Sequence, residues 1–288
     1  MRRVFKWIGI VLGSIVGLIA LAALVLFIRG NSRLNATYEA PDTVVAPSTD
    51  SVALARGEHI MRIHSCQFCH GERLEGAVFL DIPPAMVVAS NLTSGRGGVG
   101  ASYSGEDWDR AIRYGIRPNG KMLLPFMPYD IFNHLNDRDA GHLAAYLESL
   151  RPVDNQVPPS RAKFPGKLIF GNSNLLPKKR AAAIPILDEA PTAEYGKYLA
   201  STTCVACHGD QLQGGKHPDP EAPPAPPVQP TTAWTDEQFA IAMRTGRTPG
   251  RQLGEHMPWK FYADMTDTEL AALRAYIRTI AAAPAATN

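Results

Sequence analysis

The sequence predicts an all-α protein, in which one helical unit is repeated in tandem behind a single N-terminal transmembrane helix. Three observations lead to this prediction. The N-terminus contains a long apolar run without charges, and the remainder contains an internal repeat. No segment alternates apolar and polar residues for long enough to indicate a strand. With only two copies, the repeat is not that of a solenoid.

The first thirty residues have the composition of a membrane anchor. Three basic residues in MRRVFKW precede the run Ile8 to Ile28, which is free of charge and ends at Arg29. Such a run crosses a hydrocarbon core of ~30 Å at ~1.5 Å per residue. A cleaved signal peptide is the alternative, but its apolar region is normally ~7–15 residues long and a small-residue cleavage site follows. RGNSRLNATYEAP offers no convincing site of this kind. We therefore expect a retained anchor (1–30) and a polar tether (31–50).

Charge places the chain relative to the membrane and excludes one class of partner. The basic flank predicts a cytoplasmic N-terminus, so the rest of the chain is expected on the periplasmic side of the inner membrane. The formal net charge is only +2. Residues 151–191 hold seven Lys and Arg against three Asp and Glu. No basic stripe indicates nucleic-acid binding.

The repeat consists of three matching pairs of segments. GEHIMRIHSCQFCHGERLEGA (57–77) matches GKYLASTTCVACHGDQLQGGK (196–216), and EDWDRAIRYGIRPNG (106–120) matches EQFAIAMRTGRTPG (237–250). MPYDIFNHLNDRDAGHLAAYLESL (127–150) aligns without a gap with MPWKFYADMTDTELAALRAYIRTI (257–280). The predicted domains are therefore 51–150 and 192–283, and 151–191 is an inter-domain segment for which a plain connector is the simplest interpretation.

Capping residues locate the helices within each unit. Ser104, Thr235 and Thr266 are each followed three residues later by an acid or Gln, and Asn136 has the side chain of an N-cap. The helix after Asn136 carries one apolar stripe at helical spacing. We expect long loops elsewhere, notably at 78–104 and in the proline-rich stretch 217–234, and loops of this length need an organising centre.

All four cysteines lie in two copies of one motif. These are Cys66-Gln-Phe-Cys69-His70 and Cys204-Val-Ala-Cys207-His208. C-x-x-C-H is the attachment pattern of c-type haem, in which two thiols add to the porphyrin and the adjacent histidine binds the iron. A thioredoxin-like pair requires a βαβ setting, and a four-cysteine zinc site leaves both histidines without a role. Disulfides do not explain the repeated histidine. The motif predicts two covalently bound haem c groups.

With these motifs, the chain resembles the class I cytochrome c family in its tandem di-haem form. The resemblance covers about 52–150 and 192–282 and includes initial helices at RGEHI and YGKYL and final helices at AAYLESL and RAYIRTI. NLTSGRGGVG and LPFMPY are similar to segments of the cytochrome subunits of membrane-bound periplasmic dehydrogenases. The second unit lacks the NLT…GVG loop, so its haem surroundings must differ.

The repeat also selects candidates for the second axial ligand. Electron-transfer cytochromes c commonly use Met opposite the proximal His. The downstream candidates are Met86, Met122, Met127, His134, His142, His217, Met243, His256, Met257 and Met265. Only Met127 and Met257 coincide, each before Pro and an aromatic residue, and the family likewise places its ligand Met just before the last helix. We therefore expect His70 and Met127 at the first iron, and His208 and Met257 at the second, with His256 as a rival.

The function implied by the resemblance is single-electron transfer by a membrane-anchored di-haem cytochrome c without catalytic chemistry of its own. The expected partners are a dehydrogenase as donor and quinone or a terminal oxidase as acceptor. One alternative is the di-haem subunit of a cbb3-type oxidase. Another is a di-haem enzyme of the peroxidase or thiosulfate dehydrogenase type, which requires an open or unusually ligated iron.

Arg113 and Arg244 occupy matching positions in the repeat. They are expected either to pair with haem propionates or to lie on exposed helix faces.

Overall fold

The computed structural model describes residues 2–39, 50–172, 183–217 and 222–282. Parts of the predicted tether (40–49), the inter-domain segment (173–182) and the proline-rich stretch (218–221) lie outside these residues, as does position 283. The helices and strands up to residue 170 are α1 (Arg2–Leu34), α2 (Ser51–Ile63), α3 (Cys66–His70), β1 (Ala77–Ile82), β2 (Ala85–Ala89), α4 (Gly105–Tyr114), α5 (Tyr129–Phe132), α6 (Asp137–Glu148), β3 (Arg161–Ala162) and α7 (Phe164–Phe170). The elements that follow are α8 (Ala193–Thr203), α9 (Val205–His208), the 3-10 helix η1 (Gln229–Ala233), α10 (Asp236–Thr245), α11 (Trp259–Tyr262) and α12 (Asp267–Ala282).

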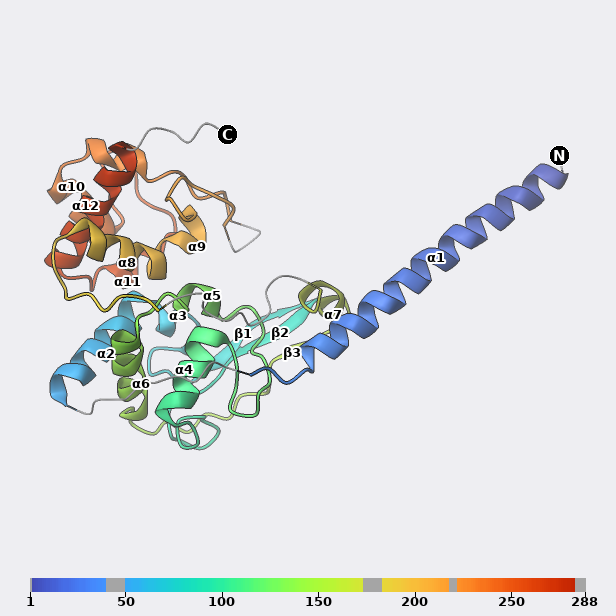
Figure 1. The fold of residues 1–288 in the computed structure, drawn as a ribbon, viewed down its shortest axis with the longest axis horizontal. Helices are drawn as coiled ribbons and strands as arrows, with labels where there is room; N and C mark the ends of the chain where they lie inside the picture. Colours follow the sequence, from blue (N-terminus) through green and yellow to red (C-terminus); the bar gives the residue numbers. More distant parts are fainter. Residues whose placement is uncertain (1, 40–49, 173–182, 218–221, 283–288) are drawn as a thin grey trace.

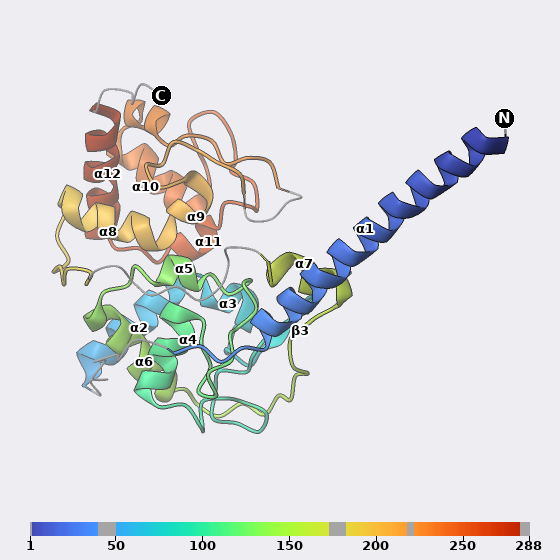
Figure 2. The same cartoon turned by 45° about the vertical axis from the view of Figure 1, so that its right-hand side comes forward.

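Helix α1 projects away from the rest of the molecule, with the N-terminus at its far end (Figure 1). Its apolar side chains are exposed from Val4 to Leu26. Among the described residues it is the one helix that is long and apolar enough to cross a membrane. The remaining helices form two groups, one above the other, and α1 leaves from beside the lower group (Figure 2).

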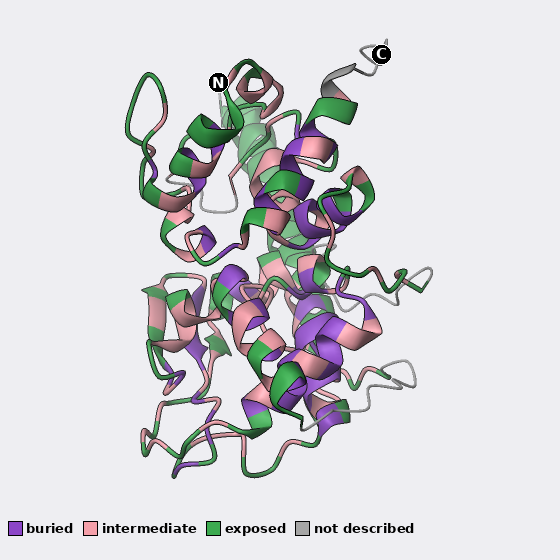
Figure 3. Cartoon of the chain, turned by 90° about the vertical axis from the view of Figure 1, so that its left-hand side faces the viewer, coloured by how far each residue is buried: buried purple, intermediate pink, exposed green. Residues whose placement is uncertain are grey.

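Each group of helices surrounds its own hydrophobic cluster. In the first group the cluster includes Ile60, Trp108, Phe132 and Leu143. In the second it includes Leu199, Phe239, Tyr262 and Leu273. Buried residues lie mainly on the inward sides of the helices (Figure 3), as the apolar stripe at helical spacing predicted.

Glycine allows the first and last helices of each group to cross closely. A Cβ on Gly57 in α2 would lie 2.0 Å from the carbonyl oxygen of His142 in α6. A Cβ on Gly196 in α8 would lie 1.9 Å from the carbonyl oxygen of Ala272 in α12. A larger residue would force these helices apart, so the repeated glycine sets the same crossing in both groups.

The predicted caps are present. Ser104 and Thr235 form capping boxes with Asp107 and Gln238. The Asn136 side chain accepts a hydrogen bond from the Asp139 backbone. The Thr266 hydroxyl accepts one from the Glu269 backbone at 3.0 Å. Local sequence alone therefore determined these helix starts.

The absence of strands was a wrong prediction. β1 and β2 form an antiparallel hairpin, and β3 pairs with β2 to complete a sheet of order β1-β2-β3. The sequence did not predict β2 because it is buried at every position. A strand that is covered on both faces does not alternate apolar and polar residues. A bulge between Val78 and Leu80 also breaks the period of β1.

Residues 151–172 are not a plain connector, because they cover one face of the first group. Asn91 Nδ2 donates to the Val153 carbonyl at 2.8 Å, and Ser160 Oγ donates to the Val88 carbonyl at 2.9 Å. Asn91 is completely buried. The NLTSGRGGVG segment therefore serves to dock the chain that follows the last helix of the first group.

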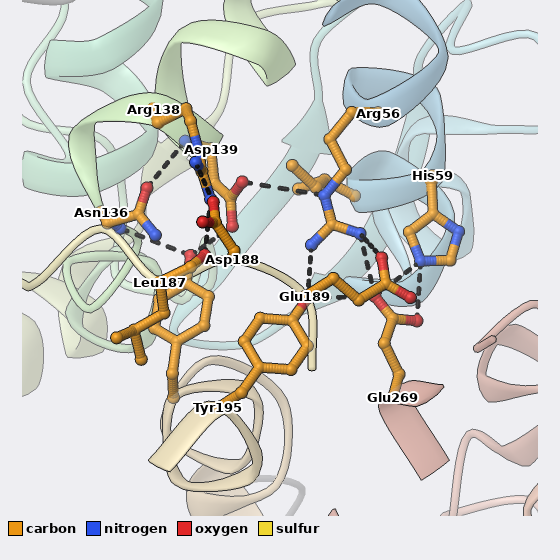
Figure 4. A network of polar contacts seen from close by, with 12 residues as sticks. Arg56, His59, Asn136, Arg138, Asp139, Leu187, Asp188, Glu189, Tyr195 and Glu269 are labelled. Carbon is orange, nitrogen blue, oxygen red and sulfur yellow. Dashed lines mark hydrogen bonds and ion pairs between the residues drawn. The ribbon is translucent and has the colours of Figure 1, made fainter. Parts of the chain in front are cut away.

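A buried polar network joins the two groups (Figure 4). Arg56 in α2 lies 2.9 Å from Glu269 in α12, and its guanidinium donates to the Tyr195 hydroxyl at 2.8 Å. His59 Nε2 lies 2.8 Å from a second oxygen of Glu269. The side chain of Ile63, also in α2, is buried in the hydrophobic cluster of the second group. Since the Glu269 side chain is fully buried, this contact is part of the folded core.

Candidate functional site

Both C-x-x-C-H motifs form short helices at corresponding positions. The first is α3, which follows α2, and the second is α9, which follows α8. The four cysteines are partly buried and form no disulfide. Burial raises the pKa of the Cys66 thiol to about 12 and that of Cys69 to about 11. A thiol–disulfide exchange site needs a thiolate with a lowered pKa, so the environment argues against that alternative.

Hydrogen bonding selects the same tautomer of the histidine in both motifs. His70 Nδ1 lies 2.8 Å from the Ser90 carbonyl oxygen, and His208 Nδ1 lies 2.8 Å from that of Pro226. A carbonyl oxygen only accepts, so Nδ1 carries the proton and Nε2 keeps its lone pair. Burial also lowers the pKa of both imidazoles, although the backbone hydrogen bond opposes this. A neutral imidazole held through its second nitrogen is the usual arrangement of a metal-ligating histidine.

The backbone after each histidine follows one pattern. Leu74 and Leu212 both adopt a left-handed conformation, with φ of 58° and 54°. Gly76 N donates to the His70 carbonyl at 2.7 Å, and Gly214 N donates to the His208 carbonyl at 2.8 Å. Positive φ is uncommon for leucine. Its recurrence shows that the repeat extends to the local geometry of both motifs.

The two Met-Pro steps also share one geometry. Leu123 N donates to the Gly115 carbonyl, and Leu253 N donates to the Gly246 carbonyl, both at 2.7 Å. These bonds close the loops that lead to Met127 and Met257. A Cβ on Gly115, whose φ is +66°, would lie 2.3 Å from the Tyr129 ring. The glycine therefore provides the space in which the aromatic residue after Met-Pro packs.

Each partly buried methionine packs against the same hydrophobic cluster as the cysteine motif of its own unit. Met127 and Cys66 border the first cluster, whereas Met257 and Cys204 border the second. The fold thus brings together residues that are distant in sequence. The assignment of Met127 and Met257 as axial ligands stays a prediction.

The competing ligand candidates have other environments. Met86, Met122, Met243 and Met265 are buried, with Met86 in β2 and Met243 in α10. His134 is exposed, and His142 is half-buried in α6. His256 is exposed, and its ring lies 5.5 Å from that of half-buried His217.

The repeated arginines connect helices. Arg113 lies 2.6 Å from Asp137, and Arg244 lies 2.7 Å from Asp267. Each pair joins the end of the third helix of its unit to the start of the last helix. Arg113 is only 1% exposed, so it does not lie on an exposed helix face. The repeated aspartates in the sequence were the signal for these pairs.

The donor set fits haem c. Each unit offers two thiols, an imidazole with the lone pair on Nε2, and a thioether beside one apolar cluster. The buried Trp108 Nε1–H finds no acceptor among the described residues. It is a donor suited to an anionic group of a bound cofactor, because buried donors are normally satisfied.

Comparisons with known proteins lead to the same cofactor. Residues 193–281 match the cytochrome c family. The chain is 26% identical to the fructose dehydrogenase cytochrome subunit of Gluconobacter japonicus, over 91% of this chain and 59% of the relative. It is also 26% identical to the cytochrome c subunit of the alcohol dehydrogenase (quinone) of Gluconacetobacter polyoxogenes, over 83% of this chain and 58% of the relative.

A third relative is comparable in length. It is a diheme cytochrome c-type protein of Cereibacter sphaeroides, 26% identical over 79% of this chain and 86% of the relative. By contrast, the chain spans less than two thirds of the length of the two dehydrogenase subunits. The match of residues 193–281 to the cytochrome c family indicates covalently bound haem c, and the chain resembles the cytochrome c subunits of bacterial dehydrogenases.

Proposed function

We propose that this chain is a membrane-anchored di-haem cytochrome c that passes single electrons on the periplasmic side of the inner membrane. Its donor is a dehydrogenase, and its acceptor is quinone or a terminal oxidase. The observation that carries the proposal is the duplicated site, in which both histidines hold Nδ1 on a carbonyl oxygen at 2.8 Å. The similarity to dehydrogenase cytochrome subunits favours this role over that of an oxidase subunit.

On this proposal, 51–150 and 192–283 are two tandem cytochrome c domains, and each binds one haem. Cys66 and Cys69 attach the first, and Cys204 and Cys207 attach the second. Haem c supplies the one-electron iron couple. His70 and Met127 ligate the first iron, and His208 and Met257 ligate the second.

The chain's own residues set the conditions for transfer. The Ser90 and Pro226 carbonyls fix the imidazole tautomers. The hydrophobic clusters exclude water, and thioether ligation raises the reduction potential. Basic residues at the start of α1 retain the N-terminus in the cytoplasm. With both positions on each iron filled, neither site is open to a substrate.

The first experiment counts haem groups and identifies their ligands in the full chain. A pyridine haemochrome assay is expected to give two haem groups per chain. The long-wavelength Met-to-ferric-haem absorption band is expected to lose half its intensity in Met127→Ala and in Met257→Ala. The matched controls are Met122→Leu and Met265→Leu, which alter buried methionines in the same two units and should keep the full band.

Two results would contradict the assignment. If the spectrum of the second haem changed in His256→Asn while the methionine–iron band stayed unchanged in Met257→Ala, the imidazole of His256 would be the second ligand. Binding of carbon monoxide by the intact reduced protein would reveal an open coordination position and favour a di-haem enzyme.

A further inference from the structure

Helix α7 crosses the end of α1 at very short range (Figure 1). Gly30 is the buried residue of α1, and a Cβ there would lie 2.0 Å from the Lys167 carbonyl oxygen. On the other side of the crossing, a Cβ on Gly171 would lie 2.3 Å from the Gly30 carbonyl oxygen. Asn172 Nδ2 donates to the Leu26 and Leu168 carbonyls, both at 2.9 Å. The two helices are therefore fixed to each other.

Two apolar side chains of α7 remain exposed at this crossing. Phe164 is 64% exposed and Ile169 is 56% exposed, as Ile28 of α1 is at 57%. The ring of Phe164 stacks on that of Phe27, with centroids 5.2 Å apart. Phe27 belongs to the last turn of the charge-free run. Phe164 consequently lies at the depth at which this run ends.

The one charged side chain of α7, that of Lys167, also fits a position at the membrane surface, where the charge-free run of α1 ends. Lys167 Nζ lies 5.5 Å from the centroid of the Phe27 ring, so its stem passes along apolar surface. Lysines near the end of a membrane span place their ammonium group among lipid headgroups. Seven residues are too few to cross a bilayer, but a short amphipathic helix lies in the interfacial plane.

We propose that α7 is a second membrane contact, whose exposed Phe164 and Ile169 enter the boundary between headgroups and acyl chains of the bilayer. The ligand is phospholipid. This inference rests on the proposed function, because it requires α1 to be a membrane anchor.

The inner side of α7 contacts the first unit. A Cβ on Gly166 would lie 1.9 Å from the Pro84 carbonyl oxygen in the β1–β2 turn. The ring of Phe170 packs edge-on against Phe126, with centroids 5.4 Å apart, and Phe126 directly precedes Met127. A single anchor leaves a domain free to rotate on the membrane, whereas two contacts fix its orientation. The Met127 loop is then held on the membrane side of the unit.

The test places a photo-reactive p-benzoyl-phenylalanine at single positions of the full chain in phospholipid nanodiscs. The test positions are 164 and 169. Position 18, on α1, reports on the anchor itself. Position 52 is the matched control, since Val52 is 76% exposed and lies on α2, on the side of the first unit away from α1 (Figure 1). Haem content checks that each variant is folded.

The expected result is lipid cross-linking at 164 and 169 at a yield comparable with position 18, and only background at 52. Lipid adducts at 18 with none at 164 or 169 would overturn the inference and leave the anchor intact. Adducts of 164 or 169 with protein instead of lipid would also overturn it. Absence of lipid adducts at 18 would overturn the anchor, and with it the membrane part of the proposed function.

Discussion

Glu269→Gln is expected to weaken the attachment of the two units to each other while leaving the local helix intact. The substitution removes the negative charge that faces Arg56 and His59. Glutamine keeps the size of the side chain and still forms a capping box with Thr266. The effect on stability therefore reports on the charge network between the units.

The pKa of Glu269 gives the magnitude. Burial raises this pKa, but hydrogen bonds and charge from His59 and Arg56 lower it more, so that it falls from 4.5 to about 2. A pKa shift of one unit is worth about 1.4 kcal/mol, so the shift of Glu269 corresponds to roughly 3 kcal/mol of stabilisation of the folded state at neutral pH. Because the folded-state pKa is the lower one, the stabilisation is complete above about 4.5 and is lost as pH falls towards about 2.

Urea denaturation of the full chain in detergent, followed by circular dichroism of the haem, measures the loss. The control is Glu58→Gln, because Glu58 pairs with Arg62 at 2.7 Å while both side chains are more than 40% exposed. Such a surface pair contributes about 0.5 kcal/mol. Equal losses in the two variants would refute the reasoning. A gap between wild type and Glu269→Gln that stays constant down to a pH of about 2 would refute it as well.

Two further predictions concern the elements that support the proposed sites. Gly115→Ala places a methyl group against the Tyr129 ring at a residue with positive φ. We expect the free energy of unfolding, measured by urea denaturation, to fall by about 2–3 kcal/mol. The methionine–iron absorption band should also shift. Gly250→Ala, with open space around it, should alter neither. Arg274→Lys removes the guanidinium hydrogen bonds to two backbone carbonyls, at 2.7 and 2.8 Å. The free energy of unfolding should fall by about 2–3 kcal/mol. Arg278→Lys, on an exposed side chain, should cost under about 0.5 kcal/mol by the same measurement.

Local features of the fold were predictable from the sequence, whereas contacts between distant segments were not. A cap such as Ser104 depends on four consecutive residues, so the motif alone identified it. The glycine that recurs as Gly57 and Gly196 was visible in the repeat, but its role in the helix crossings came only from the structure. Arg56 and Glu269, by contrast, are 213 positions apart. Arg56 lies just before the repeated segment 57–77, and the repeat aligns the segment of Glu269 with 127–150 and not with α2. Their contact arises only when the two units pack.

The candidate ligands could be selected from the sequence for a related reason, whereas the surroundings of the candidate site could not be predicted. Duplication selected Met127 and Met257 because the same step occurs twice in register. Nothing in the sequence indicated that residues 151–172 return to the first unit. The Asn91 side chain that holds them accepts a local hydrogen bond from Thr93 N and donates to the distant Val153 carbonyl. Arg274 likewise has alanine at the matching position, so no repeat revealed its role.

The contacts between the units also set an order for electron transfer on the proposed assignment. Phe68, between Cys66 and Cys69, packs edge-on against Phe261 of α11, with centroids 6.2 Å apart. Because α11 begins directly after Met257 and Pro258, the attachment loop of the first site lies beside the methionine loop of the second. The first unit holds α1 and α7, whereas the network at Glu269 connects the second unit to it. On the proposed function, we therefore expect a membrane partner to meet the first site and a periplasmic donor to reach the membrane through the second.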